Sequence, residues 1–253
     1  MISTNLYFFV LYSWMGLALL LFPVLLKVTA PYGRYQSKRW GPMVNNRMGW
    51  IFMELPSLLL FMILFLTGSV PKEAAGWIFF SVWVMHYTNR IFIYPMRIRT
   101  RGKQMPLLIM ILAIFFNFMN AFLNGYWLGY LSKTYTNSWL TDPRLIAGLS
   151  VFITGFVLNQ WSDTILISLR KGGKTGYFLP EKGMFRLISC PNFLGEIMEW
   201  IGFAIMTWSL PGMSFALWSM VNLIPRALDH HKWYHETFPD YPSKRKALIP
   251  WVL

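Results

Sequence analysis

Seven long apolar stretches constrain the fold of this chain more than any other feature of its sequence. A helix that crosses the hydrocarbon core of a bilayer needs about 20 predominantly apolar residues. Stretches of that length lie at residues 6–28, 48–69, 74–95, 105–131, 143–169, 191–209 and 212–234. Only 13% of the 253 residues are charged, against about 25% in soluble domains. The sequence therefore predicts an all-α, polytopic integral membrane protein with seven transmembrane helices.

Positive charge gathers between alternate apolar stretches. Almost all of the 23 Lys and Arg residues fall on one side of the predicted membrane, and only Lys72, Lys133 and Arg144 fall on the other. Cytoplasmic loops carry this excess of basic residues, so the N-terminus is predicted outside and the C-terminus in the cytosol. The net charge of +13 then reflects topology and contact with anionic membrane lipid. Nucleic acid is not expected as a partner.

The chain is expected to form one domain over residues 1–253, because no internal repeat or Gly/Ser-rich linker divides it. The first apolar stretch lacks a basic leader and a small-residue cleavage site, so it is expected to stay as a membrane span. The single cysteine, Cys190, rules out a disulfide framework. The expected location is the inner (cytoplasmic) membrane if the source is bacterial and the endoplasmic reticulum if it is eukaryotic. No obligate protein partner is predicted. The last two stretches are joined by the residues SLPG at 209–212, which indicate a tight turn.

Polar side chains recur at helical spacing in the last three apolar stretches. The three stripes are Asn159, Asp163 and Arg170; Asn192, Glu196 and Glu199; and Arg226, His230 and Tyr234. Residues four and seven apart lie on one face of a helix, and ionisable groups at membrane depth normally mark a site. The stripes therefore predict one buried polar pocket between these helices, with Arg170 able to hold a phosphate as a forked donor.

Glu54 lies within the second apolar stretch, in the sequence WIFMELPS at 50–57. A carboxyl group among Phe, Met and Leu loses its hydration, so Glu54 is expected to stay protonated and to donate a proton or a hydrogen bond. The phenol of Tyr87, late in the third stretch, is a donor that could pair with it. The alternatives are a structural hydrogen bond for Glu54, an interfacial position for Tyr87 and a snorkelling role for Arg90.

Known nucleotide and metal motifs are missing from the sequence. There is no Walker A loop and no GxGxxG loop, and KGGK at 171–174 is too short for a P-loop. A nucleotide would therefore bind between helices. His231 and His235 have the i, i+4 spacing of a metal pair, but no carboxylate ligand is aligned with them, so no metal is expected.

Several of these segments together resemble one enzyme family. The segments are NxxSD at 159–163, LRK at 169–171, NFLGEIMEWIG at 192–202, TWSLP at 207–211, DYPSKRKALIP at 240–250, ELPS at 54–57, and His86-Tyr87 with Arg90. In this combination the chain resembles the steroid 5α-reductases (3-oxo-5α-steroid 4-dehydrogenases), in a bacterial-type form. The C-terminal segments are shared more loosely with isoprenylcysteine methyltransferases, from which Glu54 and Tyr87 distinguish this chain.

The resemblance implies a seven-helix membrane oxidoreductase that uses NADPH to reduce the Δ4 double bond of a 3-oxo-Δ4-steroid by hydride transfer to C5. It implies that Glu54 and Tyr87 hold the C3 oxygen and stabilise the enolate, and that Trp50 and Met53 border the steroid. Met53 stands where the family often has Gln. The implied cofactor half is about 143–253, and the implied cofactor residues are Lys103 (where Arg is expected), Asn159, Asp163, Arg170, Tyr177, Asn192, Glu196, Arg226, His230 and Tyr234.

Other functions remain open on the sequence alone. The chain could reduce another lipidic enone or enal of the same superfamily, such as a polyprenal or an enoyl thioester. A methyltransferase would bind S-adenosylmethionine in place of NADPH. A membrane transporter is the alternative from a different class, although no inverted repeat is visible.

Overall fold

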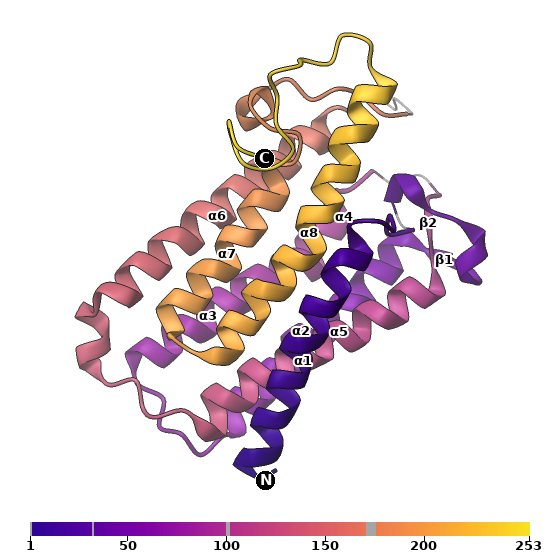
Figure 1. Ribbon diagram of the computed structural model, residues 1–253. Helices are drawn as coiled ribbons and strands as arrows, with labels where there is room; N and C mark the ends of the chain where they lie inside the picture. The colour runs from indigo at the N-terminus through magenta and orange to yellow at the C-terminus, as the bar shows by residue number, and fades with distance from the viewer. Residues whose placement is uncertain (1, 32, 100–101, 171–175) are drawn as a thin grey trace.

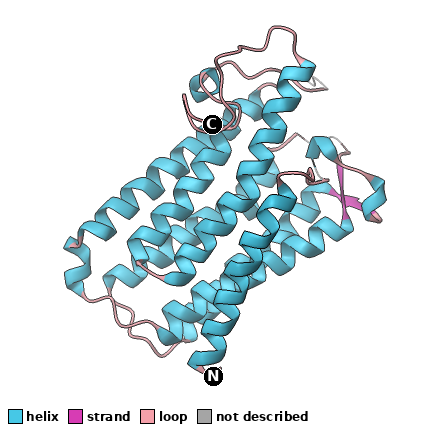
Figure 2. Cartoon of the chain, viewed as in Figure 1, coloured by secondary structure: helices cyan, strands magenta, loops and turns pink. Residues whose placement is uncertain are grey.

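The computed structural model describes residues 2–31, 33–99, 102–170 and 176–253, and helices dominate this part of the chain (Figure 1, Figure 2). The helices are α1 (Thr4–Leu25), α2 (Asn46–Thr67), α3 (Ala74–Thr88), α4 (Tyr94–Arg97), α5 (Leu107–Tyr126), α6 (Pro143–Ser168), α7 (Pro191–Thr207) and α8 (Leu210–Thr237). Five-residue π-helical turns follow α3 (Asn89–Ile93) and α5 (Trp127–Leu131). Short 3-10 helices cover Gly33–Tyr35, Lys38–Trp40, Asn137–Thr141 and Gly183–Arg186. Arg101 and the KGGK segment at 171–174 contribute to the predicted charge asymmetry, and both lie outside the described ranges.

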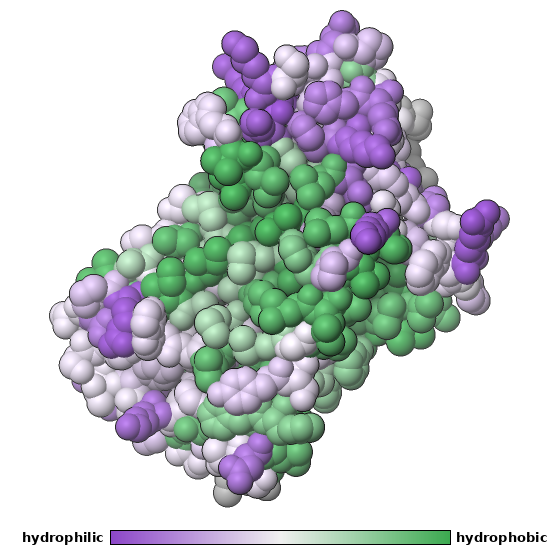
Figure 3. Space-filling view, in the orientation of Figure 1, coloured by the Kyte–Doolittle hydropathy of each residue, from purple (hydrophilic) through white to green (hydrophobic). Residues whose placement is uncertain are grey.

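Four of the helices are long and apolar enough to cross a membrane, namely α1, α2, α6, and α5 with its π-helical extension. Figure 3 shows a broad apolar surface next to a strongly hydrophilic end of the molecule. Large apolar side chains stand exposed on α1, where Leu20 is 72% and Phe9 is 69% accessible. A continuous apolar surface of this kind marks contact with lipid or with another protein. The predicted helical membrane protein is supported, while the count of seven crossings stays a prediction.

The all-α prediction needs one small correction, because two three-residue strands lie at the hydrophilic end. Strand β1 (Met43–Asn45) pairs antiparallel with β2 (Gln104–Pro106), with Val44 opposite Met105. Each strand leads directly into a helix, β1 into α2 and β2 into α5. The Asn45 side chain caps α2 by accepting from the amide of Arg47 at 3.0 Å. This pairing holds the first turns of α2 and α5 together, so their inner faces meet along their length.

The connection between α7 and α8 is shorter than the sequence predicts. Trp208 ends α7 with a left-handed φ of 43°, and the Ser209 hydroxyl accepts from the amide of Gly212 at 3.2 Å. Helix α8 therefore begins at Leu210, so the predicted tight turn is present, but it lies at Trp208 and Ser209 and not at 209–212. Pro211 is tolerated in the first turn because the N–H that proline lacks would have no helical partner there.

Glycines allow α6 and α7 to approach each other closely, and these two helices form the most extensive helix pair of the described residues. Gly148 and Gly155 on α6 face Gly202 and Gly195 on α7. A Cβ atom added to Gly155 would lie 2.5 Å from the carbonyl oxygen of Gly195, closer than any real contact. Small residues at such crossings let helix backbones pack directly in membrane proteins.

Aromatic side chains fill the core between α2, α3, α7 and α8. The rings of Phe61 and Trp83 stack with centroids 4.3 Å apart, and Trp200 lies 4.0 Å from Phe215. Such pairs contribute about 0.5–1.5 kcal/mol each beyond their burial. The chain termini lie at opposite ends of the bundle (Figure 1). The buried polar side chains around Glu54 and Arg90 lie between this aromatic core and the hydrophilic end.

Candidate active site

The carboxyl group of Glu54 is buried between α2, α5 and the π-helical turn after α3. It is 7% exposed, and it accepts from Arg90 Nη2 at 3.4 Å and from Asn117 Nδ2 at 3.4 Å. Charge-assisted hydrogen bonds are normally about 2.7–2.9 Å long. Both contacts are therefore weak, and the carboxyl group is positioned without being fully engaged by either partner.

Asn117 on α5 is a site residue that the sequence analysis missed. Its amide nitrogen also donates to the carbonyl oxygen of Met53 at 2.6 Å, and its oxygen accepts from Ser57 at 3.0 Å. Pro56 lacks an N–H and disturbs the helical hydrogen bonds at this level of α2. Asn117 inserts at the disturbed turn and links it to the carboxyl group of Glu54. The sequence feature that could have indicated Asn117 is the asparagine stripe of α5, since Asn117, Asn120 and Asn124 have the spacing of one helical face.

Arg90 is buried and does not snorkel to an interface, so that alternative for Arg90 is wrong. Its guanidinium lies 4.5 Å from the ring of Trp50 and 5.3 Å from that of Tyr94. In a π-helical turn the carbonyl of residue 90 would accept from residue 95, which is Pro95 and has no N–H. The indole of Trp50 donates to this carbonyl instead, at 3.1 Å. Trp50 thus holds both the backbone and the cation of Arg90 beside Glu54.

Tyr87 lies next to Glu54 in space, but the direct hydrogen bond suggested by the sequence is not found among the described contacts. Tyr87 is 2% exposed, and its phenol interacts electrostatically with Glu54 and has the Ser57 side chain as its hydrogen-bond partner. Its ring packs against Trp83, at 5.3 Å, and Trp200, at 5.8 Å. The phenol and the carboxyl group are therefore neighbours that share a link through Ser57 and Asn117. Met53, 9% exposed, lies on the same turn of α2.

A second buried acid, Glu199 of α7, pairs with His86 of α3. The Nδ1 atom of His86 lies 2.7 Å from Glu199 Oε2, and the acid is fully buried. The Oε1 atom of Glu199 has no hydrogen-bond partner among the described residues. The stripe of α7 predicts that Glu199 faces the pocket with Asn192 and Glu196. In the structure it turns to α3 and joins the helix that carries Tyr87 to α7.

A cavity of about 160 Å³ opens between α6, the start of α7 and the end of α8, and we call it the basic cavity. Five of the predicted cofactor residues line it: Asp163, Arg170, Tyr177, Asn192 and Tyr234. Arg34 and Arg99, which the sequence analysis did not assign to the site, also line it. The three helices that carry the predicted polar stripes therefore all contribute residues to the wall of this cavity.

The α6–α7 approach sets the polar contacts at the floor of the basic cavity. Asn159 Nδ2 donates to the carbonyl oxygen of Asn192 at 2.9 Å, and Asn192 Nδ2 donates to Asp163 Oδ1 at 3.4 Å. Glu196, half-buried on the next turn of α7, interacts electrostatically with Arg90 and Asp163. The cavity is thereby connected to the buried cluster around Glu54.

Arg34 is the clearest cation that the sequence analysis missed in this cavity. Its guanidinium lies 4.0 Å from the ring of Trp233, 4.9 Å from Tyr234 and 5.1 Å from Tyr177. Its Nη1 atom is buried without a hydrogen-bond partner among the described residues. The neighbouring Tyr35 donates to the carbonyl of Asp229 at 2.9 Å, and burial raises the pKa of Tyr35 to about 12. The loop before α2 is thus attached to α8, which no periodicity could indicate.

The remaining predicted residues lie around the basic cavity without appearing in its lining. Lys103 Nζ donates to the hydroxyl of Tyr177 at 3.2 Å. His230 is 8% exposed, its Nε2 atom has no partner in the described part of the chain, and its ring lies 5.5 Å from that of Phe193. The guanidinium of Arg226 lies 5.9 Å from the Phe193 ring. His231, the possible metal residue, lies 2.6 Å from the Ser189 hydroxyl.

The chemistry of these residues fits a phosphate-bearing dinucleotide, of which a cavity of about 160 Å³ would enclose a part. Arginine and lysine side chains pair with phosphates, and aromatic side chains stack on flat rings. Amide and carboxylate groups form hydrogen bonds with hydroxyl groups. The buried Arg34 Nη1 and His230 Nε2 atoms have no hydrogen-bond partner among the described residues. A buried polar atom without a partner costs about 1–3 kcal/mol. A ligand that supplies acceptors here would remove that cost.

Comparison with known proteins shows what the whole chain is similar to. The profile of the family described as 3-oxo-5-alpha-steroid 4-dehydrogenase matches residues 103–253. The chain is 38% identical to "Steroid 5-alpha-reductase DET2" of Gossypium hirsutum over 252 residues, which cover 98% of this chain and 95% of the relative. It is 40% identical to "3-oxo-5-alpha-steroid 4-dehydrogenase 1" of Bos taurus over 235 residues, which cover 91% of each chain. The human protein of the same name is 39% identical over 223 residues, with 87% and 85% covered.

Proposed function

Because the chain belongs to the 3-oxo-5-alpha-steroid 4-dehydrogenase family, it is an oxidoreductase acting on CH–CH bonds, and we propose that it reduces the Δ4 double bond of 3-oxo-Δ4-steroids with NADPH. Membership confirms the resemblance drawn from the sequence motifs. The observation that carries the proposal is the buried carboxyl group of Glu54, which Arg90 and Asn117 hold weakly and which lies near the phenol of Tyr87. Arg90 also interacts electrostatically with Asp163, a residue that lines the basic cavity. In the proposed reaction the substrate would lie between this acid and a cofactor held in the basic cavity.

Glu54 and Tyr87 would act on the C3 oxygen of the steroid. When hydride adds to C5 of the conjugated enone, negative charge develops on that oxygen. A protonated Glu54 and the Tyr87 phenol can donate to it, and donors fixed before the reaction stabilise such an oxyanion. The contacts of Glu54 with Arg90 and Asn117 are both long, at 3.4 Å, so neither partner holds the carboxyl group tightly and it can turn to the steroid oxygen. The buried aromatic surroundings of Tyr87 exclude water, which strengthens these hydrogen bonds.

NADPH would supply the hydride when it is bound. Arg34, Arg170 and Lys103 would hold its phosphates, because guanidinium and ammonium groups pair with phosphate oxygens. Tyr177 and Tyr234 offer flat surfaces for its rings. The amide and carboxylate groups of Asn159, Asn192 and Asp163 suit its ribose hydroxyl groups and carboxamide, and Glu196, Arg226 and His230 complete the proposed set. The cofactor half is about residues 143–253, within a single domain of 253 residues.

The proposed membrane arrangement has seven crossings, with the N-terminus outside and the C-terminus in the cytosol. Four helices have the length and composition of a membrane span, and α3 with α4, α7 and α8 would supply the other three. Termini at opposite ends of the bundle (Figure 1) support an odd number. The basic cavity would then face the cytosol, where NADPH is found, and Trp50 and Met53 would border a steroid that enters from the apolar side. The location would be the inner membrane of a bacterium or the endoplasmic reticulum.

The test is a substrate panel with detergent-purified protein. NADPH oxidation and the products would be measured with a 3-oxo-Δ4-steroid, a polyprenal and an enoyl thioester, and NADH would replace NADPH in a parallel series. We expect the 5α-reduced 3-oxosteroid with NADPH. Reduction of only the polyprenal or the thioester would replace the proposed substrate. Absence of any NADPH-dependent product from folded protein would overturn the proposed reaction.

A further inference from the structure

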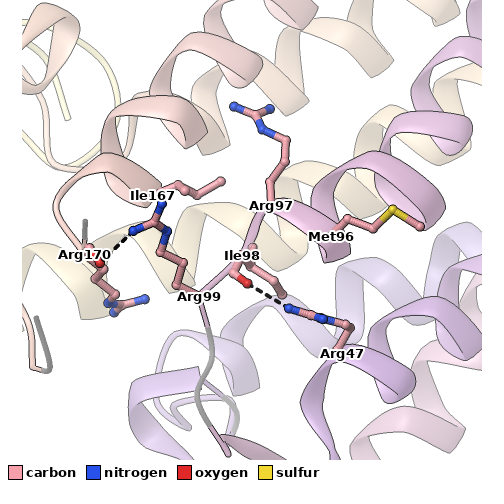
Figure 4. A pocket seen from close by; sticks show the side chains of 7 residues that line it. All are labelled: Arg47, Met96, Arg97, Ile98, Arg99, Ile167 and Arg170. Carbon is pink, nitrogen blue, oxygen red and sulfur yellow. Dashed lines mark hydrogen bonds between the residues drawn. The ribbon is translucent and has the colours of Figure 1, made fainter. Parts of the chain in front are cut away.

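A second recess adjoins the basic cavity and carries four arginines, and we call it the arginine groove. It has a volume of about 720 Å³, and its arginines are Arg47, Arg97, Arg99 and Arg170. Figure 4 shows these side chains coming from the start of α2, from the end of α4 and two residues beyond it, and from the turn after α6. Arg99 and Arg170, with Ile98 and Ile167, also border the basic cavity. Arg47 and Arg97 line the groove and not the basic cavity.

The guanidinium groups are held in place by neutral oxygens. Arg47 Nη2 donates to the carbonyl of Ile98 at 3.3 Å, and Arg97 Nη2 donates to the Thr164 hydroxyl at 2.6 Å. Arg99 Nη1 donates to the carbonyl of Arg170 at 3.2 Å. Each guanidinium has five N–H donors, so each keeps further donors for a ligand. The groove is thus an ordered cluster of donors.

No carboxylate neutralises this cluster at ion-pair distance within the described ranges. The acidic side chains found within 4.0 Å of a basic one are in the pairs His86–Glu199, Arg90–Glu54, Arg144–Asp142 and Lys232–Glu236, and none includes a groove arginine. Four like charges around one recess repel each other unless an anion lies between them. A phosphate group is an anion whose geometry matches such forked donors.

Apolar side chains complete the lining and distinguish the groove from a site for a soluble phosphate. Met96 lines the groove and is 75% exposed, and Ile98 and Ile167 contribute to the wall. Phe92, one helical turn before Met96, is 47% exposed. A phosphate carrying hydrocarbon chains would use both parts of this lining, whereas a free phosphate would leave the apolar part in water.

We propose that the arginine groove binds the headgroup of an anionic phospholipid, with its acyl chains beside Met96 and Phe92. The inference rests on the membrane arrangement proposed above, in which the end of the bundle that carries the groove lies at the cytosolic interface. It does not depend on the reductase reaction. The lipid would neutralise the arginine cluster and fix the ends of α2, α4 and α6, two of which also border the basic cavity.

Native mass spectrometry of the full chain in detergent tests the proposal. The protein would be titrated with dioleoyl phosphatidylglycerol, with dioleoyl phosphatidylcholine, and with phosphatidylglycerol in the presence of inorganic pyrophosphate. The doubly substituted Arg47→Gln/Arg97→Gln protein would be compared with wild type. Arg39→Gln/Arg186→Gln is the matched control, because both arginines are exposed on the same side but lie outside the groove.

We expect wild type and control to retain phosphatidylglycerol over phosphatidylcholine. We expect the groove variant to bind phosphatidylglycerol more weakly, by about fivefold for each arginine removed. Equal retention of the two lipids by wild type, or unchanged binding by a groove variant, would overturn the site. Full displacement of the lipid by pyrophosphate would show that the groove takes a soluble phosphate. Steroid reduction would be measured on the same samples, so that a failure of lipid binding is distinguished from a failure of the proposed reaction. If the groove variant does not fold, the comparison of the two lipids on wild type still tests the site.

Discussion

The Nδ1 atom of His86 and the Oε2 atom of Glu199 lie 2.7 Å apart, although 113 positions separate them in the chain. Both side chains are buried, so this contact joins α3 to α7 in the middle of the bundle. His86 directly precedes Tyr87, and Glu199 follows Glu196 by almost one helical turn. The pair therefore ties the helix that carries the proposed oxyanion donor to the helix that borders the proposed cofactor site.

Removing one partner of this pair should destabilise the protein. His86→Ala leaves the buried Glu199 carboxyl group without its hydrogen-bond partner, and an unsatisfied buried polar group costs about 1–3 kcal/mol. We expect the unfolding midpoint in detergent to fall by roughly 5 °C, measured by intrinsic fluorescence. Because Glu199→Gln can still form a hydrogen bond with His86, a smaller loss is expected for it. Equal losses for both variants would contradict a role for this hydrogen bond.

Glu54→Gln should abolish most steroid reduction while leaving NADPH binding intact. The amide keeps the shape of the side chain but removes the acidic proton, and loss of one oxyanion donor costs about 100- to 1,000-fold in kcat. Steady-state kinetics and NADPH fluorescence would measure the two effects. Glu73→Gln is the control, because Glu73 makes no side-chain cap hydrogen bond at the start of α3. Wild-type turnover in Glu54→Gln would remove this carboxyl group from the mechanism.

Arg34→Gln should raise the KM for NADPH more than it lowers kcat. The Arg34 guanidinium lies against three aromatic rings with Nη1 buried, and a hydrogen bond to a charged group contributes about 1.5–3 kcal/mol. An increase in KM of roughly tenfold or more is expected. Arg39→Gln, an exposed change on the same loop, should leave KM unaltered. If Arg34→Gln also does so, Arg34 does not contact the cofactor.

Gly155→Ala should weaken both the fold and the cofactor site. The added Cβ would lie 2.5 Å from the carbonyl oxygen of Gly195, and backbone cannot move aside without separating α6 from α7. Overpacking of this kind costs about 1–3 kcal/mol. The bond from Asn159 to Asn192 crosses the same interface, so NADPH binding should weaken too. Gly16→Ala is the control, because no atom lies within 4 Å of its added Cβ. Equal midpoints and NADPH affinities for the two variants would contradict the close-packing argument.

The start of α6 should lose stability in acid. Asp142 caps this helix by accepting from the Arg144 amide at 2.8 Å and also accepts from the Arg144 side chain at 2.7 Å. These hydrogen bonds lower the pKa of Asp142 from 3.8 to about 2. A lowered folded-state pKa means that the stabilisation is complete above the unfolded pKa and is lost as the pH falls towards 2. Asp142→Ala should therefore lower the unfolding midpoint at pH 7, and the difference from wild type should shrink between about pH 4 and pH 2. A constant difference across that window would contradict it.

The sequence by itself determined the character of the helices and the composition of the site. Apolar length predicts the membrane-type helices because no soluble packing requires such runs, and the motifs around Glu54, Asp163 and Asn192 indicate the family. The spacing of Asn159 and Asp163 correctly places them along α6, because periodicity within one helix is a local property, whereas Arg170 lies in the turn after that helix.

Only the tertiary structure decided which helices these side chains meet. Glu54 contacts Asn117, and Glu199 turns to His86, because the rotation of each helix depends on its neighbours and not on its own period. In a chain that is apolar on nearly every face, hydrophobic periodicity carries little information about that rotation. Arg34 reaches the basic cavity from an irregular loop, whose path is set by contacts such as Tyr35 with Asp229. Close approach at Gly155 and Gly195 then fixes the spacing on which the floor of the cavity depends.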